Sequence, residues 1–251
     1  MPLTMGGVLL IIPDELQMDI VRLPAFLEAS GATRLECLTP SLLRVMLEVC
    51  SKESLCRAFR RIVFVMTSGE ALPLDVGQLY FSKMPRTARL FNILACTETS
   101  SDVVWSELTP AVIRASLAHD PPLRMAPIGQ PVWNVGVELR PLPADVRDAF
   151  GATFGELCIR APNINPAGYF HRPELNKEKF PPAEVGMDTE GRAVATYCTR
   201  DVACWTQLGD GGTGAPISPL LCISGRADNC VKIRGFRIEM EIVEEVLNSV
   251  P

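Results

Sequence analysis

The stretch RLECLTPSLLRVMLEV, residues 34–49, contains a strand and a helix joined by the signals that start a helix. Arg34–Leu38 is a short run of strand character. Thr39 can accept a hydrogen bond from the first helical turn, and Pro40 fits the first helical position, where no backbone N–H is needed. The stretch therefore predicts a strand followed by a helix over Ser41–Val49.

The same alternation extends to both sides of this unit. Apolar runs of strand length alternate with helical segments, the first of which is amphipathic and closed by Gly31. A β-α-β-α-β-α-β order indicates a parallel sheet with right-handed crossovers, so the expected fold class is α/β. The predicted elements are strand Val8–Ile12, helix Asp19–Ala29, strand Arg34–Leu38, helix Ser41–Val49, strand Ile62–Met66, helix Pro73–Lys83 and strand Ala88–Ile93.

Polar segments follow the last two predicted strands. Thr67–Glu70 comes after one of them and Thr97–Asp102 after the other. In open α/β sheets, ligands bind outside the carboxyl ends of the strands. The sequence therefore predicts a ligand site built from these two segments.

The composition of the chain changes from about Pro110, where prolines become frequent and strand-like runs become short. This pattern indicates a second, mostly β module. A basic strand-like segment, Val231–Arg234, then leads into a predicted acidic amphipathic helix, Glu239–Leu247. The predicted strands of the β module are Val135–Arg140, Glu156–Arg160, Arg192–Tyr197 and Leu220–Ser224.

Composition excludes several classes of protein. Apolar residues make up 47% of the chain and charged residues 21%, which is the balance of a globular protein. A net charge of −5 without a basic cluster argues against nucleic-acid binding. No apolar run reaches the roughly 20 residues that span a bilayer. We therefore expect no nucleic-acid partner and no membrane partner.

The nine cysteines include no C-x-x-C pair and no zinc-type spacing with histidine. We expect buried, reduced thiols in a cytoplasmic protein. The only histidines are His119 and His171, and neither lies near a nucleophile elbow. Serine-hydrolase chemistry is therefore not expected.

Several segments, in the same order, resemble adenylation domains of the adenylate-forming (AMP-binding) superfamily of acyl-CoA synthetases, peptide synthetases and luciferases. The most specific is GRADNCVKIRGFRIE, Gly225–Glu239, which resembles G-R-x-D-x-Q-V-K-I-R-G-x-R-I-E. The residues of these motifs resemble most closely those of nonribosomal peptide synthetases. The other segments are Ser68–Leu72, Asn92–Glu98, Pro127–Pro131, Gly155–Ile159, Gly168-Tyr169, Arg172–Leu175, Lys179-Phe180 and Tyr197–Asp201.

The resemblance implies a partial acyl-adenylate synthetase fold in three parts. These are an α/β lobe at residues 1–110, a β-rich, barrel-like module at 111–225, and a hinge with the start of a small α+β subdomain at 226–251. It also implies a reaction in which ATP activates an amino acid or other carboxylic acid as acyl-AMP. A phosphopantetheine thiol, on a carrier-protein domain of a longer parent chain or on CoA, would then accept the acyl group.

The resemblance assigns roles to individual residues. Thr97 would bind the α-phosphate, and Glu98 would hold Mg²⁺ and act with Thr97 in catalysis. Asp201 would bind the ribose hydroxyls of ATP or AMP, and Arg226 would bridge ribose and phosphate. Asp228 would be the hinge. Gly69, Glu70, Ala71, Asn92, Leu94, Lys232 and Gly235 complete the expected cofactor-binding set, and Leu38, Met66, Ser68, Ile93, Ser101 and Asp102 form the expected substrate pocket.

Other interpretations of these residues remain open at this stage. Thr97-Glu98 could cap a helix, and Asp201 and Arg226 could form surface ion pairs. Leu38, Met66 and Ile93 could be ordinary core residues at strand ends. For these three residues, the sequence supports the pocket and the core interpretations equally.

The chain also departs from the family pattern. Leu94 replaces an aromatic residue that stacks on adenine, and Arg200 replaces a glycine, which costs about 1 kcal/mol or more if that position needs a positive φ. The glycine-rich phosphate loop, the pocket aspartate and the catalytic lysine are not found. We therefore expect a fragment that is inactive by itself. The alternatives are an acyl-CoA synthetase fragment and a non-catalytic binding protein on a degenerate scaffold.

Overall fold

The computed structural model describes residues 3–17, 19–144, 146–147, 151, 153–181, 186–187, 191–209, 217–228, 230–233, 236–239, 243 and 247. The helices are η1 (Leu3–Met5), α1 (Asp14–Gln17), α2 (Arg22–Ser30), α3 (Pro40–Val49), α4 (Lys52–Ala58), α5 (Leu74–Lys83), η2 (Thr97–Thr99), α6 (Pro110–Ala118) and α8 (Pro173–Lys179). The strands are β1 (Arg34–Leu38), β2 (Phe64–Thr67), β3 (Arg89–Cys96), β4 (Ser101–Leu108), β5 (Gln130–Pro131), β6 (Gly136–Pro141), β7 (Gly155–Ala161), β8 (Gly186–Met187), β9 (Ala193–Thr206), β10 (Leu220–Arg226), β11 (Cys230–Ile233) and β12 (Phe236–Glu239).

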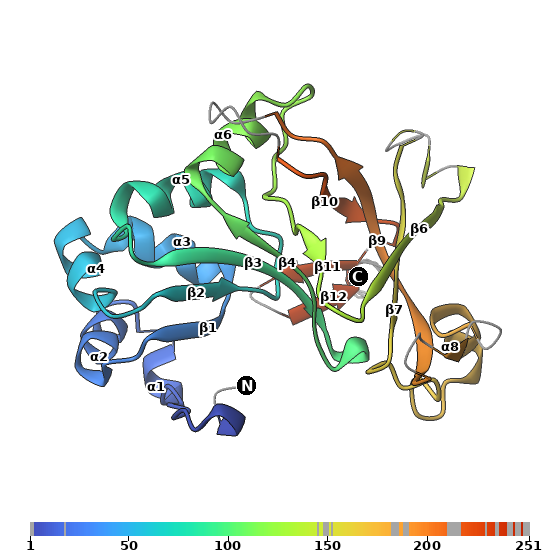
Figure 1. Cartoon of the computed structure of the whole chain (residues 1–251), viewed down its shortest axis with the longest axis horizontal. Helices are drawn as coiled ribbons and strands as arrows, with labels where there is room; N and C mark the ends of the chain where they lie inside the picture. The colour runs from blue at the N-terminus through green and yellow to red at the C-terminus, as the bar shows by residue number, and fades with distance from the viewer. Residues whose placement is uncertain are drawn as a thin grey trace.

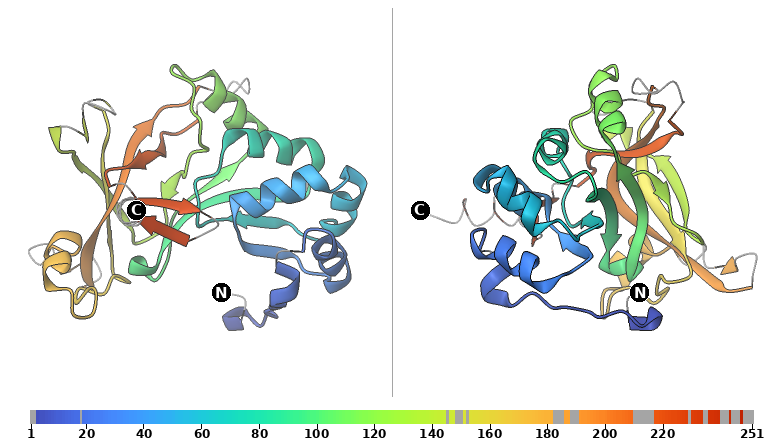
Figure 2. Two further views of the ribbon diagram at one scale, coloured as in Figure 1. Left: turned by 180° about the vertical axis from the view of Figure 1, so that it is seen from behind. Right: turned by 60° about the vertical axis from the view of Figure 1, so that its left-hand side comes forward.

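The first sheet has the strand order β1-β2-β3-β4-β5. β1, β2 and β3 run parallel, and β4 and β5 continue the sheet antiparallel. Helices α3, α4 and α5 lie behind this sheet in Figure 1 and in front of it in the reverse view of Figure 2, so they cover one of its faces. The predicted parallel α/β arrangement is confirmed for these three strands.

The helices of this layer begin where the sequence signals place them. Thr39 accepts a hydrogen bond from the Leu42 backbone N–H at 3.3 Å, so it caps α3 with Pro40 in the first turn. Helix α2 starts later than predicted because the Asp19 carboxylate accepts the Arg22 N–H at 2.9 Å. It ends at Gly31, whose φ of 66° confirms the predicted glycine stop.

The predicted strand at Val8–Ile12 is wrong. This run joins no described sheet, and Val8 and Ile11 are 89% and 76% exposed. β1 forms the edge of the first sheet and pairs with β2 alone among the described strands. An apolar run has strand structure only when a neighbouring strand satisfies its backbone groups, and local composition does not supply that neighbour.

The second sheet has the order β10-β9-β7-β6, and β8 pairs with β9. All of its pairs are antiparallel, and the long strand β9 lies between β7 and β10. Its buried face packs Leu157, Ile159 and Tyr197 against Val103 and Val104 of the first sheet. The four predicted strands of the β module are therefore confirmed as β6, β7, β9 and β10.

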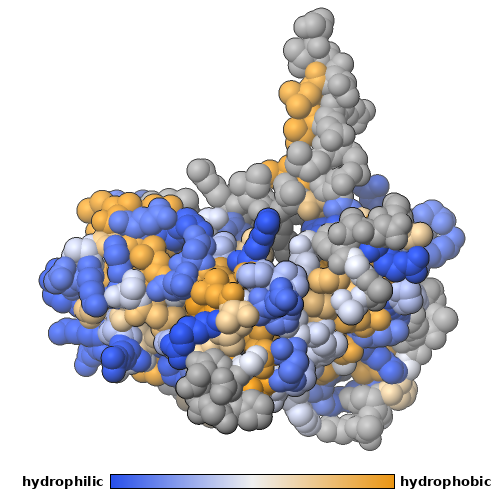
Figure 3. Space-filling model, turned by 90° about the horizontal axis from the view of Figure 1, so that it is seen from above, coloured by the Kyte–Doolittle hydropathy of each residue, from blue (hydrophilic) through white to orange (hydrophobic). Residues whose placement is uncertain are grey.

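The end of the described chain is a two-stranded sheet, β11 paired with β12. β11 confirms the predicted strand near Val231. The predicted helix Glu239–Leu247 begins at a residue of β12, and beyond Glu239 only Val243 and Leu247 are described. No helix among the described residues has the length and apolar character needed to cross a membrane. In the view of Figure 3, apolar residues reach the surface in separate patches among polar ones.

A short backbone contact joins the two sheets. The Leu221 N–H donates to the Gly129 carbonyl at 2.8 Å, and the Leu221 carbonyl accepts from the N–H groups of Ile128 and Gly129. Gly129 has a φ of 94°, and a Cβ atom there would lie 2.1 Å from the Trp105 carbonyl oxygen. Only glycine therefore fits at position 129, immediately before β5, where the backbone pairs with Leu221 of β10.

Gly129→Ala should destabilise the protein more than another alanine substitution at positive φ. Gly191 has a φ of 75° with no atom within 4 Å of a built Cβ, so Gly191→Ala should cost about 1–2 kcal/mol of backbone strain alone. Gly129→Ala should cost about 2 kcal/mol more because its methyl group meets backbone atoms. Urea unfolding of both variants measures the difference, and equal costs would contradict the close contact at Gly129.

Candidate functional site

A pocket of about 390 Å³ lies between the two sheets, and we call it the inter-sheet pocket. It forms at the carboxyl ends of β2 and β3, where the first sheet meets β9 and β10. A volume of this size is within the usual range for small-molecule sites. Its lining residues are Ser68, Gly69, Leu94, Ala95, Cys96, Thr97, Glu98, Tyr197, Thr199, Asp201 and Arg226.

The pocket brings together residues that lie far apart in the sequence. Among the residues assigned from the family resemblance, Ser68, Gly69 and Leu94 enter it from the first sheet, together with Thr97 and Glu98 of η2. Asp201 and Arg226 enter it from β9 and β10, where they are paired in register. Both polar segments predicted to form a ligand site therefore contribute to one cavity.

Thr97 and Glu98 are held in a tight turn. They lie in the 3-10 helix η2, which Ser100 ends with a φ of 58° before the chain returns as β4. The N-cap of this short helix is Cys96, so the interpretation of Thr97 as a helix cap is wrong, although Glu98 does lie in the first turn. The Tyr169 hydroxyl donates a hydrogen bond to the Glu98 carboxylate, which fixes that carboxylate from the second module.

A loop of the second module holds the other side of this turn. The Asn163 side-chain amide donates to the Thr99 carbonyl, and the Ser100 hydroxyl donates to the Asn163 carbonyl at 3.1 Å. Cys96 lies at the start of the turn, and burial raises the pKa of its thiol to about 11. The turn that carries Thr97 and Glu98 is thus clamped by contacts from a distant segment.

Arg226 forms the centre of the charged wall of the pocket. Its guanidinium Nη1 lies 2.7 Å from Asp201 Oδ1, and its Nε lies 2.6 Å from Asp228 Oδ1. It also donates to the Thr199 carbonyl at 3.2 Å. Arg226 and Asp201 therefore do form an ion pair, but in the pocket wall rather than on the surface, because each side chain is only 14% exposed.

The protonation of this cluster follows from burial and pairing. Burial disfavours the charged guanidinium, but the Asp228 hydrogen bond and the Asp201 charge outweigh it and raise the pKa of Arg226. Burial likewise opposes ionisation of Asp228, but its bonds to Arg226 hold the Asp228 pKa below the usual range. The wall therefore carries a cation between two carboxylate side chains.

Arg200 precedes Asp201 at the position where the family has glycine, and its φ is 67°. Its backbone N–H donates to Glu156 at 3.1 Å, and its guanidinium Nη2 lies 2.5 Å from Glu178. The Asp201 N–H in turn donates to the Thr199 hydroxyl at 2.9 Å. The chain therefore follows a left-handed path despite the side chain, and Asp201 still faces the pocket.

Three of the residues assigned to nucleotide binding do not line the pocket. The Asn92 amide donates to the carbonyls of Ala126 and Pro127 and is buried beneath them. The Glu70 carboxylate accepts from the Ser41 N–H at 3.1 Å, at the start of α3, and Ala71 is exposed. Asn92 and Glu70 therefore position backbone segments around the site.

The residues assigned to the substrate pocket separate into several environments. Leu38 is 4% exposed and belongs to the core beneath the helices, which confirms the core interpretation for this residue. Met66, Ile93 and Asp102 line a second cavity of about 410 Å³. It lies on the face of the first sheet that the helices α3, α4 and α5 do not cover. Ser68 lines the inter-sheet pocket, and the Ser101 backbone pairs with Cys96.

Some expected residues cannot be placed, and others were missed. Only the backbone of Lys232 is described, within β11, and Gly235 lies outside the described residues. Tyr197 and Thr199 line the pocket, and Tyr169 binds Glu98, although none of the three was assigned to the site. The signal was present because all three belong to segments that resemble family motifs.

Comparison with known proteins gives a family for most of the chain. The model of a family described as AMP-binding enzyme matches residues 1–170. Bacitracin synthase 1 of Bacillus licheniformis is 31% identical over 253 residues, which is 98% of this chain and 4% of that protein. Enterobactin synthase component F of Escherichia coli (strain K12) is 29% identical over 255 residues, which is 100% of this chain and 17% of that protein.

Solved structures agree with this result. The crystal structure of IdnL1 is similar with a TM-score of 0.71 and 26% identity, covering 98% of this chain and 45% of that one. NpsA-ThdA from Klebsiella oxytoca, an artificially fused adenylation-PCP di-domain, has a TM-score of 0.63 at 22% identity, covering 97% of this chain and 38% of that one. The second likeness concerns the fold alone. The chain spans less than half the length of these proteins, and the predicted α/β fold class is confirmed.

Arg200→Gly should be more stable than Arg200→Ala. Both substitutions remove the ion pairs with Glu156 and Glu178, but only glycine adopts a φ of 67° without strain. We expect a difference of about 1 kcal/mol in the free energy of unfolding. Urea denaturation measures it, and Glu178→Gln serves as a control for the partly exposed ion pair. Equal stability of the glycine and alanine variants would contradict strain at this position.

Asp228→Asn should destabilise the protein at neutral pH by about 1–3 kcal/mol, because it weakens charge-assisted hydrogen bonds to Arg226. The folded-state pKa of Asp228 lies below its unfolded value. Its contribution is therefore complete above the unfolded pKa of about 3.9 and is lost as pH falls through the folded pKa. Urea unfolding from pH 7 to pH 3 should show the two proteins converging, and a constant gap would contradict the assignment.

Proposed function

The chain belongs to the AMP-binding enzyme family, and from this premise we propose that the inter-sheet pocket binds the adenosine monophosphate part of a nucleotide. The parent reaction would be the ATP-dependent activation of an amino acid or other carboxylic acid as acyl-AMP. A phosphopantetheine thiol of a carrier-protein domain would then accept the acyl group. A further relative, 30% identical over 256 residues, is named a dimodular nonribosomal peptide synthase, which supports the peptide-synthetase type over an acyl-CoA synthetase.

The observation that carries the proposal is the pairing of Asp201 and Arg226 in one pocket wall, at 2.7 Å. A carboxylate can accept hydrogen bonds from both ribose hydroxyls, and a guanidinium can donate to phosphate oxygens. Because Asp228 holds Arg226 from the side, the guanidinium is oriented before a ligand arrives. Thr97 lines the same pocket and supplies a hydroxyl for the α-phosphate.

The adenine part of the ligand would contact the lining residues Ser68, Gly69 and Leu94. Ser68 and Gly69 follow β2, and Gly69 has a φ of 87°, which lets the backbone turn along the pocket. Leu94 offers only an aliphatic surface where the family has an aromatic ring. Tyr197 lines the same pocket and supplies an aromatic surface. The Tyr197 side chain, however, lies beside Tyr169 and Glu98, on the side of the pocket proposed for phosphate, so Leu94 would contact adenine with an aliphatic surface alone.

The residues present also suit a magnesium ion. The Glu98 carboxylate lines the pocket and is held by the Tyr169 hydroxyl, so a hard oxygen donor is fixed near the proposed phosphate position. When bound, Mg²⁺ would neutralise phosphate charge. The role of Tyr169 would be to keep the Glu98 carboxylate directed into the pocket.

AMP binding tests the proposal directly. Asp201→Ala should weaken AMP binding by about ten-fold or more, since a charge-assisted hydrogen bond contributes about 1.5–3 kcal/mol. For the same reason, 2′-deoxy-AMP should bind the unaltered chain more weakly than AMP. Calorimetric titration measures both differences.

The control variant is Glu174→Ala. Glu174 is exposed on α8, pairs with Lys177 at 2.9 Å and does not line the pocket, so its removal should leave AMP affinity unchanged. If AMP fails to bind the unaltered chain, or binds Asp201→Ala equally well, the pocket is not a nucleotide site. The non-catalytic alternative on this scaffold would then be favoured.

A further inference from the structure

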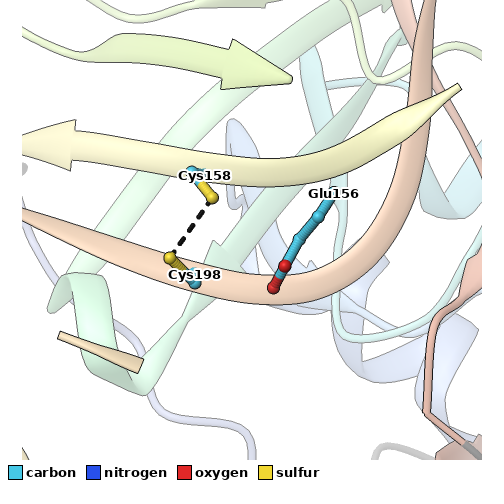
Figure 4. Close-up of side chains that lie close together, drawn as sticks. All are labelled: Glu156, Cys158 and Cys198. Atoms are coloured by element: carbon cyan, nitrogen blue, oxygen red, sulfur yellow. Dashed lines mark hydrogen bonds between the residues drawn. The ribbon is translucent and has the colours of Figure 1, made fainter. Parts of the chain in front are cut away.

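Two cysteines face each other across the second sheet. Cys158 of β7 and Cys198 of β9 are direct partners in an antiparallel pair, and their Sγ atoms lie 3.3 Å apart. Figure 4 shows the two side chains pointing toward one another from neighbouring strands. Directly opposed residues have Cα atoms about 4.5–5.5 Å apart, which falls in the range that a disulfide bridges. The backbone therefore already has the spacing that a bond requires.

The two thiols are not equivalent. The Cys158 S–H donates to the Cys198 sulfur, and Arg140 Nη1 of β6 donates to the same sulfur at 3.4 Å. The hydrogen bond to Cys198 and burial both raise the pKa of Cys158. Cys198 thus accepts from two donors, one of them cationic, and these contacts distinguish its sulfur from the S–H donor Cys158. Cys198 is therefore the attacking sulfur of the pair, and Cys158 is the sulfur that stays protonated.

Burial limits the size of the reagents that could oxidise this pair. Both cysteines are buried, but the Arg140 side chain that contacts Cys198 is 23% exposed. Because both sulfurs are buried next to a side chain that is only partly exposed, a reagent as small as hydrogen peroxide suits this pair better than a peptide or a large thiol. The oxidant that fits the site is thus a small hydroperoxide.

A metal ion fits the same residues less well. Glu156 is the third group of the cluster, with a carboxylate oxygen within 4.8 Å of both sulfurs. That carboxylate already accepts the Arg200 N–H at 3.1 Å, and the Arg200 guanidinium lies 3.9 Å from it. Arg140 and Arg200 place two cationic side chains beside the cluster, which opposes the entry of a third positive charge.

We infer that Cys158 and Cys198 form a redox-active dithiol that a hydroperoxide converts into an intramolecular disulfide. The Cys198 thiolate attacks the peroxide oxygen and breaks the O–O bond, leaving a sulfenic acid and releasing one water or alcohol. The Cys158 sulfur then attacks the sulfenic sulfur, forms the S–S bond and expels water. Two thiols are oxidised by two electrons, and the hydroperoxide is reduced. This inference does not depend on the proposed nucleotide site.

The same sheet contains a matched pair for comparison. Cys204 of β9 and Cys222 of β10 are also antiparallel partners and are also buried. Their sulfurs make other contacts, to the Thr206 hydroxyl at 3.4 Å and the Leu220 carbonyl at 3.8 Å. No arginine contact is described for either sulfur. Cross-strand register alone therefore does not distinguish the two pairs, but the contacts of their sulfurs do.

The experiment treats the fully reduced chain with a few equivalents of hydrogen peroxide, without denaturant, and maps the alkylated peptides by mass spectrometry. The unaltered chain should lose about 2 Da and yield one Cys158–Cys198 linked peptide, which dithiothreitol reverses. Cys158→Ser should stop at a sulfenic acid on Cys198 that dimedone traps. Cys198→Ser should form neither product, and Arg140→Met should slow the reaction about three-fold or more.

The double variant Cys204→Ser, Cys222→Ser should react like the unaltered chain, since it keeps the first pair. Three results would overturn the inference. One is a disulfide that forms only after unfolding in urea. Another is a first bond that joins Cys204 and Cys222. The last is one zinc ion bound to the reduced chain with Cys158 and Cys198 unreactive toward peroxide.

Discussion

The backbone contact between Gly129 and Leu221 is the constraint on which the pocket depends. It fixes β5 against β10 and so places the carboxyl ends of β2 and β3 opposite β9. The contact requires a residue without a Cβ atom, because the Trp105 carbonyl occupies that space. Thr97 and Glu98 lie opposite Asp201 and Arg226 because this junction acts together with the packing of Val103 and Val104 against the second sheet.

Charge is concentrated along the strands that reach this junction. Arg226 connects Asp201 with Asp228, and Arg200 connects Glu156 with Glu178. Each carboxylate therefore has a cationic neighbour, and this pairing keeps the pKa of the largely buried Arg226 raised despite the opposing effect of burial. The left-handed backbone at Arg200 is tolerated in the same way, since the Glu156 carboxylate accepts its N–H. A departure from glycine at this position thus changes the surroundings of Asp201 without removing it from the pocket.

Much of the fold could be predicted from local signals. Thr39 with Pro40 marked the start of α3, Gly31 marked the end of α2, and apolar runs marked β2, β3 and the strands of the second sheet. The prediction failed at Val8–Ile12, where strand composition met no neighbouring strand. It also missed β4, which follows the turn at Ser100 and makes the sheet antiparallel there. In both cases strand formation depends on pairing with a residue far away in the sequence, which a short stretch of sequence does not reveal.

By itself, the sequence determined the family, the α/β class and the residue types that the pocket contains. The order and spacing of the motifs are properties of the chain, and they brought Gly69, Thr97 and Asp201 into one hypothesis. Only the tertiary structure decided what those side chains contact. Asn92 and Glu70 belong to the same motifs but hold backbone segments, while Tyr169 reaches Glu98 across the module boundary. The reason is that a hydrogen bond depends on distance and direction in space, which sequence separation does not specify.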